Sequence, residues 1–147
     1  MEREHLILFL NRLLANYFVL YIKLHRYKWF MKGKHIFAFQ TYFEEMYRSM
    51  KDDIDMLAEH LLSMDGKPFA TMVKFIKEAT IEEATADDEE EEMIEQLAND
   101  FSQVGNEMKE IGIKKAEKIN DDLTKHLLLC LEQKLNKYIW RCKAYYK

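Results

Sequence analysis

The chain has 147 residues, of which 48% are hydrophobic and 33% charged, and these proportions predict a single globular domain spanning residues 1–147. Four glycines and one proline leave few points at which the chain can turn, which favours long helices over many short strands. The formal net charge of −4 excludes a general electrostatic attraction to DNA or to anionic membranes.

The start of the chain and its two cysteines indicate the compartment. Charged residues begin at Glu2, and Asn11 and Arg12 interrupt the apolar run, so the start resembles neither a secretory signal nor a transmembrane span. Cys130 and Cys142 fall on one expected helix about 18 Å apart, which is too far for a disulfide. Two free thiols are typical of a reducing environment, and we therefore expect a cytoplasmic protein.

Two long helices are predicted in the first half of the chain, at about residues 4–31 and 36–64, because apolar side chains recur there at the helical period. Gly33 suits a left-handed turn between them, and the turn cluster at 65–68 ends the second helix. The expected core positions are Leu10, Leu13, Leu14, Tyr17, Tyr21 and Leu24 in the first helix, and Phe39, Phe43, Tyr47, Met50, Ile54, Leu57 and Leu61 in the second.

A long connection at 69–84 separates these helices from two more, and its apolar residues predict a short helix within it. The third long helix is expected to open at Thr85 as its N-cap, and the fourth to start after 120–121. The residues on which these expectations rest are Met72, Val73, Phe75 and Ile76 in the connection, Leu97, Phe101, Val104, Met108 and Ile111 in the third helix, and Leu123, Leu127, Leu131, Leu135, Tyr138 and Cys142 in the fourth.

This order of elements predicts an all-α fold, a ferritin-like four-helix bundle with a long crossover that carries a short helix. The length of the connection disfavours an up-and-down bundle with short loops.

Three segments carry the most specific motifs. Residues 23–29 read Lys-Leu-His-Arg-Tyr-Lys-Trp, residues 39–44 read Phe-Gln-Thr-Tyr-Phe-Glu, and residues 55–59 read Asp-Met-Leu-Ala-Glu. Together they resemble the signature of the Dps family, the dodecameric miniature ferritins of bacteria and archaea, in which the segments usually read K-L-H-N-Y-H-W, L-H-x-x-F-E/D and D-x-x-A-E-R. The resemblance covers nearly the whole chain, including a crossover helix at 75–83 and a final-helix tryptophan at Trp140.

The resemblance implies an iron-oxidising site at a two-fold subunit interface, with histidines from one subunit and carboxylates from the other. The two histidine positions hold Lys28 and Gln40 in this chain, whereas the carboxylates Glu44, Asp55 and Glu59 remain. On a helical wheel these three acids lie about 40°, 60° and 100° from Gln40, so they share one stripe. On composition alone, solvated surface acids are the more usual interpretation of such residues.

Lys28 would place an ammonium where the cation should sit, and it would neutralise Asp55 or Glu59 across the interface. We therefore expect a metal site converted to an intersubunit salt bridge, with Trp29 beside it. Carboxylates alone bind divalent cations weakly, whereas imidazole suits iron. Iron binding is accordingly expected to be weak, and the ferroxidase activity of the family weak or lost.

The five histidines do not form a clear replacement site. His5 lies at the terminus, and His35 and His126 are expected on the surface. His25 lies one turn before the ligand position and is expected to pack or to form a hydrogen bond, and His60 is expected to pair with a carboxylate. A substitute ligand set that includes His25 or His60 stays open.

The resemblance also implies an acidic pore and DNA binding, and both are in doubt here. Asp121 and Asp122 match part of the pore region, but Lys125 and His126 follow where a further acid is usual. The last helix offers a modest basic patch, and a solvated helix end is its more ordinary interpretation. That patch consists of Lys134, Lys137, Arg141, Lys143 and Lys147. DNA binding is therefore expected to be weak or absent.

Three hypotheses follow from these residues. The first is a stress-protection or iron-sequestering cage, a homo-dodecamer with little iron oxidation that co-assembles with an active paralogue. The second is an active mini-ferritin with substitute ligands, and the third a non-enzymatic DNA-protecting cage. Lys28 and Gln40 favour the first over the second. Apolar residues expected to contact other subunits are Phe30, Phe37, Tyr42, Tyr145 and Tyr146.

Overall fold

The computed structural model describes residues 1–84 and 89–145, and within these ranges every regular element is a helix. The elements in chain order are α1 (Glu2–Phe30), α2 (Ile36–Ser63), α3 (Met72–Glu78), α4 (Glu90–Glu107), the π-helical turn η1 (Met108–Gly112), α5 (Ile113–Lys118) and α6 (Asp122–Tyr145). The all-helical prediction is confirmed.

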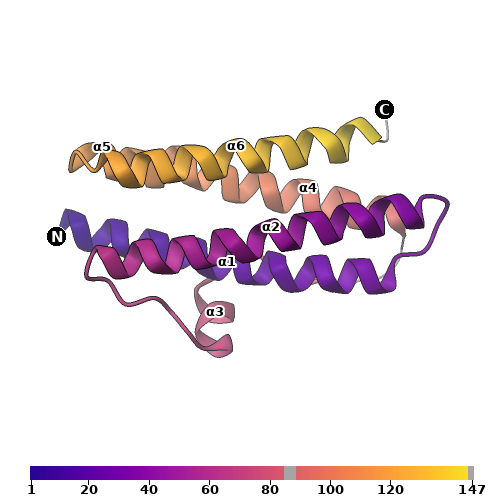
Figure 1. Cartoon of the computed structure of the whole chain (residues 1–147), viewed down its shortest axis with the longest axis horizontal. Helices are drawn as coiled ribbons and strands as arrows, with labels where there is room; N and C mark the ends of the chain where they lie inside the picture. The colour runs from indigo at the N-terminus through magenta and orange to yellow at the C-terminus, as the bar shows by residue number, and fades with distance from the viewer. Residues whose placement is uncertain (85–88, 146–147) are drawn as a thin grey trace.

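The four long helices form a bundle of two layers (Figure 1). Helix α1 packs along α2 in one layer, and α4 packs along α6 in the other, with α5 continuing the line of α4. The crossover runs from the end of α2 across the outside of α1, where α3 lies, and then leads to α4. This is the ferritin-like bundle that the sequence predicts.

Helix α1 is largely buried, because it contacts α2 and α3 and also the second layer of the bundle. It is long and apolar enough to cross a membrane by length and composition, and 61% of its most apolar stretch is buried inside the protein. A central bundle helix and a membrane-spanning helix share this property, so the burial is the more informative observation. Leu10, Leu14 and Tyr17 are buried as predicted, and Tyr21 is half-buried.

The short helix α3 is held to α1 by one aromatic residue. Phe75 is buried and stacks on Phe18 of α1, with ring centroids 4.2 Å apart. The Thr71 hydroxyl caps the helix by accepting a hydrogen bond from the Lys74 backbone N–H. The prediction that this helix spans 75–83 is wrong, because it ends at Glu78, where the next residue turns to an extended conformation.

The predicted core position Ile111 is wrong. Ile111 lies in the π-helical turn η1 and is 42% exposed, whereas the following Gly112 is buried. A π-helical turn adds a residue to the turn, so a pattern extrapolated at the α-helical period falls out of phase there. A side chain at Gly112 would collide with the Phe9 ring, which explains the glycine. The predicted N-cap Thr85 lies outside the described residues, and α4 begins at Glu90.

The predicted core position Leu123 is also wrong, since its side chain is 78% exposed. Thr124 is fully buried instead, and Leu127, Leu131 and Leu135 continue the core line as predicted. Steps of four residues drift around a helix by about 40° each, so the line leaves the buried face when it is extended backwards to position 123.

The turns between helices use residues that tolerate unusual backbone angles. Gly33 has a φ of +131° in the turn between α1 and α2, in agreement with its predicted role. Asp65 after α2 and Asn120 after α5 adopt left-handed φ values of 62° and 57°. The backbone N–H of the residue after each one donates a hydrogen bond to a carbonyl of the preceding helix. Gly66 donates to the Leu61 carbonyl at 2.8 Å, and Asp121 donates to the Ala116 carbonyl at 2.9 Å.

Candidate functional site

Lys28 in the last turn of α1 forms an ion pair with Glu44 of α2. The Lys28 Nζ lies 2.8 Å from Glu44 Oε1, and it also donates to the Tyr47 hydroxyl at 3.4 Å. The hydrogen bond to Glu44 raises the pKa of Lys28, and the same bond lowers the pKa of Glu44. Both side chains are partly exposed, at 26% and 34%. The pair is therefore fully charged over the physiological range.

Gln40 is committed to a structural hydrogen bond. Its Nε2 donates to the backbone carbonyl of Lys28 at 2.9 Å. The last carbonyls of an α-helix lack partners within the helix, so this bond satisfies one of them at the end of α1. The amide thus joins the two helix ends.

His25 and Tyr47 form an aromatic layer next to the ion pair. Their rings stack with centroids 3.7 Å apart, and His25 Nδ1 donates to the Tyr21 carbonyl at 2.8 Å. Trp29 meets the His25 ring edge-on at 5.7 Å and is 67% exposed. The expectation that His25 packs and hydrogen-bonds is confirmed.

Lys28 has an acidic partner within its own chain that the sequence analysis does not predict, because Glu44 neutralises its ammonium. The pairing with Asp55 or Glu59 across a subunit interface stays a prediction. Asp55 and Glu59 are exposed and lie further along α2 than Glu44. Within the described part of this chain, no three His, Cys, Asp or Glu side chains lie close enough together to hold a metal ion. An ammonium and an engaged amide nitrogen do not fit iron as ligands.

The remaining histidines also have local roles. The expectation that His60 pairs with a carboxylate is wrong, because its Nε2 lies 2.7 Å from the Thr124 hydroxyl of α6. His35 Nδ1 lies 2.7 Å from Glu90 Oε1, which ties the turn between α1 and α2 to the start of α4. His126 is exposed on α6, as expected.

The predicted pore and basic residues are partly engaged within the chain. Asp121 caps α6 by accepting from the Thr124 backbone N–H at 3.0 Å, so it confirms the predicted cap. Lys134 pairs with Asp53 at 3.0 Å, and the Arg141 guanidinium lies 5.4 Å from the Tyr42 ring centroid. Lys147 falls outside the described residues.

Two ion pairs in which one side chain is buried are absent from the sequence-based prediction. Lys23 of α1 pairs with Asp100 of α4 at 2.7 Å, with exposures of 3% and 13%. Asp53 of α2 is likewise buried at 5% beside Lys134. Helical spacing offered a signal for Lys23, because Val19 and Tyr27 lie one turn to either side of it and both are buried.

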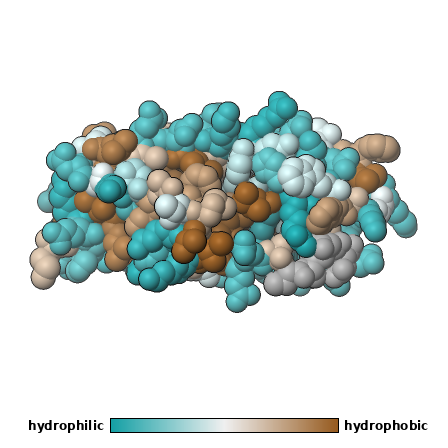
Figure 2. Space-filling model, turned by 90° about the horizontal axis from the view of Figure 1, so that it is seen from below, coloured by the Kyte–Doolittle hydropathy of each residue, from teal (hydrophilic) through white to brown (hydrophobic). Residues whose placement is uncertain are grey.

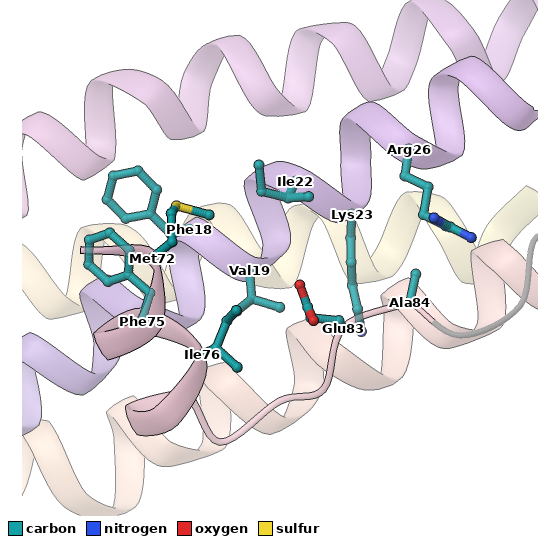
Figure 3. A pocket seen from close by; sticks show the side chains of 10 residues that line it. All are labelled: Phe18, Val19, Ile22, Lys23, Arg26, Met72, Phe75, Ile76, Glu83 and Ala84. Carbon is teal, nitrogen blue, oxygen red and sulfur yellow. The ribbon is translucent and has the colours of Figure 1, made fainter. Parts of the chain in front are cut away.

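An apolar groove lies between α1 and α3 (Figure 3). Phe18 and Phe75 stand at one end of it, and Lys23 and Arg26 lie toward the other. The exposed apolar side chains that line it are Ile22 (46%), Met72 (56%) and Ile76 (51%). In the view of Figure 2, hydrophobic residues gather over the middle of the face that carries this groove.

Residues 7–147 match the ferritin-like domain family. The chain is 39% identical over 142 residues to General stress protein 20U of Bacillus subtilis, and the alignment covers 97% of each chain. It is 38% identical to the DNA protection during starvation protein of Brevibacillus brevis, over 92% of this chain and 91% of the relative.

Solved structures resemble the fold closely. The crystal structure of a Dps protein from Bacillus brevis superposes with a TM-score of 0.96 at 35% identity, over 99% of this chain and 97% of that one. A Dps protein from Vibrio cholerae O1, described as a member of a superfamily of ferritin-like diiron-carboxylate proteins, gives 0.93 at 29% identity, over 99% and 91%.

Proposed function

The chain belongs to the Dps family of ferritin-like proteins, and from this premise we propose that it is the subunit of a cytoplasmic stress-protection cage whose ferroxidase centre is degenerate. The names of its relatives support the stress role, since they include a general stress protein and proteins of DNA protection during starvation. The cage is a dodecamer of this chain, alone or co-assembled with an active paralogue.

One observation supports the degenerate centre above the others, the ion pair of Lys28 and Glu44 at 2.8 Å. A carboxylate that would serve iron already accepts from an ammonium of its own chain. An arriving ferrous ion has to displace that ammonium or come close to it, and like charges at short range repel. Gln40 adds to this, because its Nε2 is bound to a backbone carbonyl. Iron therefore binds weakly at this position.

The alternative of an active mini-ferritin with substitute ligands receives less support. His25 is stacked on Tyr47 with Nδ1 bound to a carbonyl, and His60 is bonded to Thr124 of α6. Recruiting either imidazole to a metal requires that these contacts break. DNA binding also receives little support, because Lys134 is paired with Asp53 and the net charge is −4.

The apolar groove between α1 and α3 supports assembly. Three large apolar side chains that line it stand exposed, and contiguous apolar surface of this kind is typical of subunit interfaces. Covering the groove with a second copy would bury Ile76, which is 51% exposed in the single chain.

The iron test uses the double variant Lys28→His and Gln40→His. An anaerobic ferrous titration followed by oxidation with oxygen and with peroxide should show little activity above background in the wild-type protein. The double variant should bind iron measurably, because Glu44, Asp55 and Glu59 are already present. Strong wild-type oxidation that disappears in His25→Ala or His60→Ala would contradict the proposal and support a rebuilt centre.

The assembly test compares two variants of α3. Ile76→Glu places a charge in the apolar groove and should shift light scattering toward smaller species. Lys77→Glu adds the same acid to the same helix without removing apolar surface, and it should assemble as the wild type does. A wild-type protein that stays monomeric at micromolar concentration would contradict the cage.

A further inference from the structure

The exposed face of α6 carries a thiol and an imidazole in direct contact. Cys130 Sγ lies 3.6 Å from His126 Nε2, and both residues are exposed. They stand four positions apart, one helical turn, and therefore share one face of the helix. Neither takes part in the Lys28 site or in the core, and the proposed function does not use them.

The separation of these two atoms equals the bite that a tetrahedral zinc ion requires. Zinc lies about 2.3 Å from a cysteine sulfur and about 2.0–2.1 Å from a histidine nitrogen. At a tetrahedral angle those two bonds place sulfur and nitrogen about 3.5 Å apart, and the observed separation is 3.6 Å. Two ligands at i and i+4 on one helix face are also the arrangement by which helical zinc motifs chelate the ion.

From this geometry we propose that His126 and Cys130 chelate a thiophilic divalent cation of the zinc class. Binding breaks the S–H bond of Cys130, releases its proton to solvent and forms a sulfur–metal bond, while neutral His126 donates the lone pair of Nε2. Water molecules, or the same pair from a second copy of the chain, complete the four ligands. Asp122, a further turn back on the same face, adds negative charge near the entering cation.

The pair prefers zinc to ferrous iron for a chemical reason. Thiolate is a soft ligand, and a tetrahedral sulfur and nitrogen set favours zinc, whereas iron oxidation in this family uses carboxylates and imidazole. The proposed site is therefore separate in position and in ligand type from the one at Lys28. Variants at Lys28 or Glu44 should leave it unchanged.

The test titrates Co²⁺, a spectroscopic substitute for zinc, into the reduced full-length protein. The wild type should develop a sulfur-to-cobalt charge-transfer band that saturates and that Zn²⁺ then removes. Cys130→Ser should abolish the band. His126→Ala should weaken binding by about tenfold or more, because one of two linked ligands is lost.

The other cysteine provides a matched control. Cys142 is buried on the same helix, and burial raises the pKa of its thiol to about 12, so Cys142→Ser should keep the band. Circular dichroism establishes that each variant is folded. A band that survives in Cys130→Ser, binding unaffected by His126→Ala, or no band in the wild type at millimolar Co²⁺ would each overturn the proposal.

Discussion

Helix α1 carries two lysine–carboxylate pairs that differ mainly in their contact with water. Lys23 and Asp100 are 3% and 13% exposed and join the two layers of the bundle, whereas Lys28 and Glu44 are 26% and 34% exposed and join α1 to α2 within one layer. The distances are nearly equal, 2.7 Å and 2.8 Å. Distance alone therefore does not tell which pair the fold needs.

Burial separates the two roles. A buried charge that loses its partner keeps its desolvation penalty, whereas a partly exposed charge is stabilised by water when the partner leaves. Burial raises the pKa of Asp100 even with Lys23 beside it, whereas the hydrogen bond from Lys28 lowers the pKa of Glu44. We therefore expect the fold to depend on the first pair more than on the second.

The largest expected effect follows from removing the buried cation. Lys23→Met leaves the Asp100 carboxylate without its partner and should lower the free energy of unfolding by about 3–5 kcal/mol. Chemical denaturation monitored by circular dichroism measures this change. A loss no larger than that of an exposed pair would end the distinction drawn from burial.

Two further variants control that experiment. Lys114→Met removes an exposed i,i+4 pair with Glu110, in which the nitrogen–oxygen distance is 2.9 Å, and should leave the unfolding free energy unchanged within error. Replacing both partners, as Lys23→Met with Asp100→Leu, should recover most of the loss, because no buried charge stays unpaired.

The pair of Lys134 and Asp53 is intermediate, with the cation 46% and the acid 5% exposed. Lys134→Met should therefore lower stability by about 1–3 kcal/mol at neutral pH. Burial raises the pKa of Asp53 in the folded protein, so the folded state takes up its proton more readily than the unfolded chain. Stability then falls as pH rises through the window between the unfolded and folded pKa values.

Lys134 opposes the effect of burial on the pKa of Asp53, so Lys134→Met should raise that pKa further. The pH range over which stability falls should therefore become wider. The destabilisation by Lys134→Met should be largest above the folded-state pKa of Asp53 and should shrink once the acid is protonated. Denaturation curves collected from acid to neutral pH measure the trend. A destabilisation independent of pH would show that lost packing of the lysine stem, and not the charge, is responsible.

Much of the fold followed from periodicity and turn chemistry. Leu10, Phe43 and Phe101 were predicted in the core and are buried, because a long apolar stripe at the helical period has few alternatives. The wrong predictions at Ile111 and Leu123 have different causes. Sequence spacing does not report the π-helical turn around Ile111. The drift at Leu123 does follow from helical geometry, and steps of four residues were extended too far.

The candidate site was less predictable than the fold. The motifs singled out Lys28, Gln40 and Glu44, but they did not predict that Lys28 contacts Glu44 within one chain. The partner of Lys28 was not predictable, because side-chain reach across a helix pair depends on rotamers and on the crossing of α1 and α2. His60 shows the same limit, since its neighbour Thr124 lies on the distant helix α6.

The smallest expected effect concerns Lys28. Lys28→Met should leave the unfolding midpoint within error of the wild type, because Glu44 is partly exposed and water can replace the ammonium. The pKa of Glu44 should nevertheless rise, since the hydrogen bond from Lys28 is the main cause of its lowering. A carbon-13 NMR titration of the carboxyl groups measures this shift directly, and Lys28→Arg should largely preserve the lowered value.

The pH dependence has a definite sign. A lowered folded-state pKa of Glu44 gives a stabilisation that is present above the unfolded pKa and is lost as pH falls through the folded pKa. Any difference between wild type and Lys28→Met should therefore vanish in acid. A destabilisation comparable to that of Lys23→Met would make Lys28 a structural residue. If the fold tolerates the change, a double-histidine variant that assembles but fails to bind iron can be attributed to the geometry of the centre rather than to a damaged bundle.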